Sequence, residues 1–206
     1  KQIRDALKEL GKKGGIMDAG ESMDVVANPT LARDLITDPA LNVNNQNNPN
    51  LSAGMTFLGQ FLDHDITFDP TSSLERQSDP ESIQNFRTPL FELDSVYGSG
   101  PGASPHLYDQ STEGEGIKFH IEEIPGAVAV SAGGFPRFDL PRNSQGTALL
   151  GDPRNDENLI VSQLHLAILK FHNAVVDYVK AEFELTNPEE VFTEAQRLVR
   201  WHYQWI

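Results

Sequence analysis

The sequence contains no cysteine among its 206 residues, which excludes disulfide bonds, zinc thiolate sites and a cysteine nucleophile. Basic residues are also scarce: 16 lysines and arginines stand against 30 aspartates and glutamates, a formal net charge of -14. This balance disfavours nucleic acid or an anionic membrane as partner and is compatible with divalent cations. No apolar run approaches the roughly 18 residues of a membrane span, so we expect a soluble chain without one.

The most informative stretch, residues 51–70, has the periodicity of an amphipathic helix. One broad face is apolar: Leu51, Met55, Leu58, Phe61 and Leu62. The opposite stripe is polar: Thr56, Gln60, Asp63 and His64. Such a stripe is typical of a surface helix, yet Phe57 and Phe61 flank this one and a carboxylate directly precedes an imidazole. The stripe is therefore a candidate site as well as a candidate solvent face.

A second polar run, residues 151–158, precedes a segment from 157 to 183 that is apolar on nearly all sides and is typical of a core helix. Asp152 and Pro153 signal a turn, and Asp156 is positioned to cap the helix. Taken alone, the run therefore indicates helix capping beside a surface arginine, Arg154. Further helices are expected at 2–10, 31–36 and from Asn187 onward, and a short hairpin around 117–121.

A third pattern, of oxygen-bearing residues at every second position, lies at residues 88–94. Thr88, Leu90, Glu92 and Asp94 lie two apart, so an extended or looped backbone can turn their oxygens to one side. A hydroxyl, a main-chain carbonyl and two carboxylates are oxygen ligands that suit calcium. From spacing alone, a half-buried strand is the stronger reading.

The run Gly-Gln-Phe-Leu-Asp-His-Asp at 59–65 resembles the distal haem motif of the animal-type haem peroxidases, the peroxidase and cyclooxygenase superfamily. The run at 151–158 resembles that family's distal arginine motif. The resemblance implies that His64 is the distal acid and base, that Arg154 assists it, and that Gln60 holds water or halide. It also implies a haem b esterified through Asp63 and Glu157. Because the position of the third haem link, a methionine in chloride-oxidising relatives, is an asparagine here, that link is expected to be absent.

The family's calcium loop precedes a similar Val-Tyr-Gly-Ser sequence, present here at 96–99. The resemblance therefore implies a Ca²⁺ ion bound by Asp65, Thr88, Leu90, Glu92 and Asp94. Glu92 stands where the family usually has Asp, and Asp94 where many members have Ser, so the ligand set is longer and more acidic than usual.

The resemblance predicts a mainly α fold, the helical fold of the animal-type haem peroxidases, with long loops and little β structure. The resemblance covers almost the whole chain from about Leu31 on, and residues 1–206 are expected to form the N-terminal, distal part of one catalytic domain. The proximal iron ligand is expected beyond Ile206, in the remaining proximal half of the domain. No other histidine matches the proximal context: His165 and His172 are expected to be core residues, and His106 and His120 surface or packing residues.

The predicted function is a haem peroxidase that uses hydrogen peroxide to oxidise halides or small phenolic donors. Three alternatives remain open: a fatty-acid dioxygenase of the same superfamily, a non-catalytic calcium-binding or adhesion module, and a helical domain with coincidental motifs. The presence of Asp63, Arg154 and Glu157 together argues against the dioxygenase. The residues do not fix the compartment, and of the alternatives we favour a secreted protein.

Overall fold

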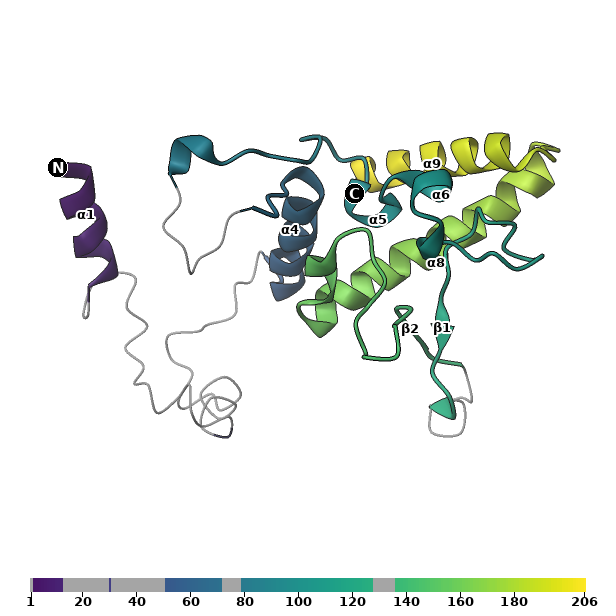
Figure 1. Ribbon diagram of the computed structural model, residues 1–206, viewed down its shortest axis with the longest axis horizontal. Helices are drawn as coiled ribbons and strands as arrows, with labels where there is room; N and C mark the ends of the chain where they lie inside the picture. Colours follow the sequence, from purple (N-terminus) through teal and green to yellow (C-terminus); the bar gives the residue numbers. More distant parts are fainter. Residues whose placement is uncertain (1, 13–29, 31–50, 72–78, 128–135) are drawn as a thin grey trace. The chain divides into compact units, whose positions relative to one another are not determined.

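The computed structural model describes residues 2–12, 30, 51–71, 79–127 and 136–206 (Figure 1). The chain divides into two compact units, Lys1–Ser52 and Ala53–Ile206. In the first unit, helix α1 spans Gln2–Gly11 and confirms the predicted N-terminal helix. The helix expected at 31–36 lies outside the described residues.

Three long helices dominate the second unit: α4 (Ala53–Ile66), α8 (Leu159–Glu182) and α9 (Pro188–Trp205). Helix α8 packs against both α9 and α4, and Figure 1 shows α9 folded back along α8. The remaining elements are short: η1 (Pro80–Ser82), α5 (Asp94–Tyr97), α6 (Gly100–Ala103), η2 (Pro105–Leu107), β1 (Glu122–Glu123), β2 (Phe138–Asp139) and η3 (Pro153–Asp156). This composition confirms the expected mainly α fold.

Buried aliphatic side chains join α8 to α9. Val161, Val176 and Val179 of α8 and Val191, Ala195 and Val199 of α9 are all fully buried. Between these valines, His165 and His172 of α8 are buried at 1% and 0% exposure, which confirms them as core histidines. His106 and His120 are exposed, as expected.

The helix caps differ in part from the sequence prediction. Asn187 accepts hydrogen bonds from the amides of Glu189 and Glu190, which confirms it as the cap of α9. The cap of α8 was assigned to Asp156, and that assignment is wrong. Asn158 caps the helix through a 3.0 Å bond from Val161 N, because Asp156 instead accepts from both terminal nitrogens of Arg142 at 2.7 and 2.8 Å.

Helix α4 buries part of its predicted apolar face and, beside it, two polar residues. Phe61, His64 and Asp65 are buried, whereas Leu51 and Met55 are 54% and 48% exposed. The two polar residues are buried through tertiary contacts: Asn155 of η3 bonds to His64, and the amides of Leu93 and Ser95 at the start of α5 bond to Asp65. Most of the expected apolar face, Phe61 included, lines a groove of about 450 Å³ together with Ile160 and Leu164 of α8.

The segments expected to be extended form little β structure. Strand β1 pairs antiparallel with β2. Phe119, within the predicted hairpin, forms an isolated bridge, but its partner is Tyr108, which precedes residues 117–121. Residues 88–94 form no strand. Two tight turns, Leu90 N to Thr88 O and Glu92 N to Leu90 O, bend this segment before α5.

Helix α8 is long and apolar enough, by length and composition, to cross a membrane. This match rests on length and composition alone, so the expectation of a chain without a membrane span stays a prediction. The same helix buries nine residues and packs against α9 and α4. A helix with that packing is typical of the core of a soluble protein.

Candidate active site

The two sequence motifs meet where α4 lies against η3 and the start of α8. Gln60 Nε2 donates to Glu157 Oε2 at 3.1 Å, across 97 positions of sequence. Asn158 Nδ2 donates to Gln60 Oε1, also at 3.1 Å. The amide of Gln60 is therefore held on both sides by the second motif, and the structure brings together two residues that sequence alone had assigned to one site.

His64 is joined to the second motif through a buried asparagine. The ring is 5% exposed, and its Nδ1 lies 2.8 Å from Asn155 Oδ1. Asn155 is fully buried, and its Nδ2 lies 2.9 Å from Nδ1 of His165 on α8. Burial lowers the pKa of His165 to about 4, so this second imidazole is neutral at physiological pH.

Arg154 lies at the carboxyl end of α4. Its guanidinium donates to the carbonyl of His64 at 3.1 Å and to the carbonyl of Thr67. A cation is favourable there because the last carbonyls of a helix lack partners within the helix. Arg154 therefore contacts the backbone of His64 rather than its ring.

A buried carboxylate holds Arg154 in place. Asp152 is fully buried and accepts from Arg154 Nε at 3.1 Å and from a terminal nitrogen at 2.8 Å. It also accepts from Arg87 at 2.7 Å. Burial works to raise the pKa of Asp152, but the hydrogen bonds from Arg154 and Arg87 outweigh it and hold the pKa below its usual value.

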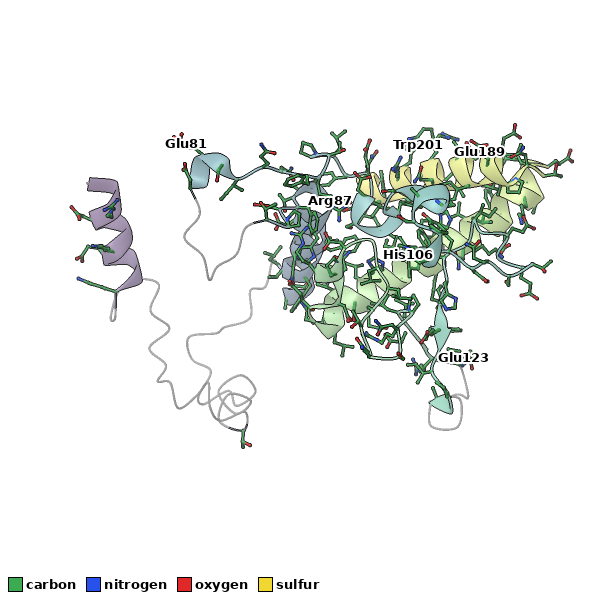
Figure 2. The ribbon with its side chains drawn as sticks, in the orientation of Figure 1. Glu81, Arg87, His106, Glu123, Glu189 and Trp201 are labelled. Atoms are coloured by element: carbon green, nitrogen blue, oxygen red, sulfur yellow. The ribbon has the colours of Figure 1, made fainter. Side chains whose placement is uncertain are left out.

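Arg87 connects Asp152 to the loop before α5. Arg87, labelled in Figure 2, donates to the carbonyl of Asp94 at 3.3 Å. Its guanidinium and that of Arg154 both lie over the ring of Phe68, at 5.0 and 5.2 Å from the centroid. One aromatic ring and one carboxylate therefore position two arginines, of which one belongs to the predicted site.

The outer side of α4 is open next to these residues. Asp63 and Glu157 are exposed and Gln60 is half-buried. A Cβ added to Gly59 would meet nothing within 4 Å among the described residues. Carboxylates, an amide and an unobstructed glycine along one exposed surface fit a large planar cofactor with carboxylate attachment points. These residues therefore fit the haem that the resemblance implies.

The expected calcium ligands are only partly assembled. Asp65 is fully buried and accepts from the amides of Leu93 and Ser95 at 3.0 and 3.3 Å. Burial raises the pKa of Asp65, and the nearby charge of Asp94 adds to the rise although the two amides oppose it. The hydroxyl of Ser95 is buried and lacks a hydrogen-bond partner in the described part of the chain.

The other expected ligands are either exposed or bonded to an arginine. Thr88 and Leu90 are exposed, and the carbonyl of Glu92 accepts from Arg200 at 2.6 Å. Arg200 also pairs with Asp94 at 3.8 Å. Within the described ranges, no group of three or more His, Asp or Glu side chains is arranged for a metal. The calcium site remains a prediction.

Several residues that build the site carried no functional assignment from sequence. Asn155, Asn158 and Arg87 are the clearest cases. The first two lie inside the second motif, so their places next to Arg154 and Glu157 were an available signal. Arg87 is 65 positions from Asp152, and no local pattern links the two.

Comparison with known proteins adds an independent finding. A sequence model of the animal haem peroxidase family matches residues 74–206. The matched segment contains Arg154 and Glu157 but begins after Gln60 and His64. The bonds from these two residues to Glu157 and Asn155 therefore tie the unmatched α4 to the matched segment. No curated protein gives a significant match.

Proposed function

This chain belongs to the animal haem peroxidase family, and from that premise we propose that it forms the distal side of a haem site that reduces hydrogen peroxide. The observation that carries the proposal is the meeting of the two motifs, in which Gln60 and His64 bond to Glu157 and Asn155. Haem b, when bound, supplies the iron at which peroxide is reduced. The proximal ligand would come from outside these 206 residues.

His64 is proposed as the group that moves the proton. Because the amide oxygen of Asn155 carries no hydrogen, Nδ1 of His64 must be the donor in their 2.8 Å contact. A neutral His64 then has its lone pair on Nε2. That atom accepts a proton from hydrogen peroxide and returns it to the departing oxygen as water forms.

Arg154 and Gln60 complete the proposed chemistry. Arg154 would stabilise the negative charge that develops as the O–O bond breaks. Gln60, held by Glu157 and Asn158, would orient water or a halide. Halides or small phenols are the proposed electron donors.

The haem would be held by esters to Asp63 and Glu157. Both carboxylates are exposed on the open side of α4 and η3. If the esters form, haem will stay with the protein during extraction with acidified organic solvent, and the Asp63→Asn, Glu157→Gln double variant will release it. Free haem in the extract of the unaltered protein would exclude the esters.

The catalytic assignment is tested by steady-state peroxidase assays on the haem-loaded full-length protein with a phenolic donor. His64→Ala is expected to lower the rate of peroxide reduction about 10²- to 10⁴-fold, because the proton acceptor is lost. His120→Ala, an exposed histidine, is the matched control and should be unaffected. Equal rates in the two variants would remove His64 from the mechanism.

A further inference from the structure

From His64 to the core of α8 runs a chain of three polar side chains, His64, Asn155 and His165, whose hydrogen bonds have only one consistent direction in this structure. Asn155 links the two imidazoles, with Oδ1 2.8 Å from His64 Nδ1 and Nδ2 2.9 Å from His165 Nδ1. An amide nitrogen only donates and an amide oxygen only accepts. His165 therefore carries its proton on Nε2, and His64 carries its proton on Nδ1.

The two tautomers are thus coupled through one side chain. If the proton of His165 moved to Nδ1, the amide of Asn155 would have to turn over to accept it. Its nitrogen would then donate to His64, whose proton would have to move to Nε2. The proposed lone pair at His64 Nε2 would be lost.

Burial keeps this chain intact. Asn155 is 0% exposed and His165 is 1% exposed, so water does not compete for the inner bond. Burial also lowers the pKa of His165 to about 4, so its Nδ1 is available as an acceptor at neutral pH. A buried amide that is bonded at both ends is rigid because breaking either bond leaves an unpaired polar group.

We propose that Asn155 and His165 are positioning residues that fix His64 as the Nδ1-protonated tautomer and so leave Nε2 free to accept a proton. The proposal rests on the proposed function for its purpose, but the coupling is a property of the chain alone. It assigns a role in the site to a residue of η3 and to a histidine in the core of α8.

The test is a ¹H–¹⁵N correlation spectrum of the imidazoles in the full chain labelled with ¹⁵N-histidine, without haem or peroxide. Signals are assigned by recording His64→Gln and His165→Gln. The unaltered chain should show His64 protonated at Nδ1 and His165 protonated at Nε2. Protonation of His64 at Nε2 would overturn the proposal without any variant.

Two substitutions at position 155 then test the coupling. Asn155→Leu removes the acceptor, so the Nδ1 signal of His64 should shift toward the unprotonated range. Asn155→Asp presents only acceptors, so His64 should keep its Nδ1 proton while the proton of His165 moves from Nε2 to Nδ1. That second shift is a signature that a merely structural role would not produce, and it keeps the proposal testable if Asn155→Leu does not fold.

Asn173→Leu is the matched control. Asn173 is a half-buried asparagine of α8 that bonds to the backbone of Phe119 at 2.7 and 2.9 Å and does not touch His64. Its replacement should leave the His64 signals in place. If Asn173→Leu shifts them as much as Asn155→Leu, or if neither substitution at 155 shifts any imidazole signal, the two tautomers are not coupled through Asn155.

Activity separates this proposal from the function on which it rests. In the haem-loaded full-length protein, Asn155→Leu should lower peroxide reduction by about 10- to 100-fold. The predicted tautomers in a protein without peroxidase activity would uphold the positioning of His64 by Asn155 and His165 and refute the proposed function. Full activity in Asn155→Leu would uphold the proposed function and refute the positioning role of Asn155.

Discussion

At the scale of single residues, the site depends on buried polar groups that each satisfy several partners. Asp152 is the clearest example, because one buried carboxylate bonds to both Arg154 and Arg87. A buried charge of this kind is stabilising only while its partners remain. Removing that charge should therefore affect stability as well as the position of Arg154.

Asp152→Asn should lower the free energy of unfolding by about 3 kcal/mol, because it leaves two partly buried guanidinium groups without their carboxylate. Chemical denaturation measures this change. Asp156→Asn is the control, since Asp156 ends the 3₁₀ helix that Asp152 caps and also binds an arginine but is 26% exposed. Its loss should cost about 1 kcal/mol or less. Equal losses in the two variants would show that burial of Asp152 adds nothing.

The residue types of the site were predictable from sequence, but their contacts were only partly so. Gln60, His64, Arg154 and Glu157 were assigned because their order and spacing match two motifs. That Arg154 bonds to the backbone of His64 was not predictable, because it depends on the packing of η3 against α4.

At the scale of elements, the sequence predicted the start of a helix best where neighbouring residues alone mark it. Asn187 followed by a proline marks the start of α9 correctly, because cap and first turn are both local. The cap of α8 was misassigned by two positions, since the choice between Asp156 and Asn158 is decided by the distant Arg142. The burial of His64 and Asp65 on α4 was not predictable for the same kind of reason: the neighbours of the helix, not its periodicity, bury these two residues.

Helix α8 carries two buried neutral histidines and should make the protein sensitive to acid. Burial lowers the pKa of both His165 and His172 from 6.5 to about 4. Between these values the unfolded chain binds protons that the folded chain does not. Stability is therefore complete above pH 6.5 and is lost as the pH falls toward 4, by on the order of 3 kcal/mol for each histidine.

Thermal unfolding at a series of pH values checks this dependence. His172→Gln should make the decline between pH 6.5 and 4 shallower, because one of the two linked protonations is gone. His106→Ala removes an exposed histidine and should leave the decline unchanged (Figure 2). A midpoint temperature that stays constant from pH 6.5 to 4 would contradict the account of α8.

At the scale of the whole molecule, the proposed calcium ion would link α4 to the loop before α5. Asp65 already bonds to the amides at the start of α5, and Asp94 lies close enough to raise its pKa. A cation bound there would offset the repulsion between these carboxylates. The sequence placed its ligands on two segments, and the structure brings those segments into contact.

Added calcium should therefore raise the midpoint temperature of chelator-treated protein, by the equivalent of about 2.7 kcal/mol at a hundredfold excess over Kd. Asp65→Asn should abolish the rise. Asp63→Asn, the exposed neighbour two positions earlier, should retain it. A calcium response that survives Asp65→Asn would place the ion elsewhere, and no response in the unaltered protein would remove it.

The central claim is that residues of α4 and η3 form the distal side of a working haem site. Its most direct test is the absorption spectrum of the full-length protein, purified with haem supplied, before and after addition of hydrogen peroxide. We predict a Soret band that shifts on peroxide addition, and in His64→Ala a Soret band that is retained but shifts far more slowly. The absence of a Soret band from the full-length protein would contradict the claim.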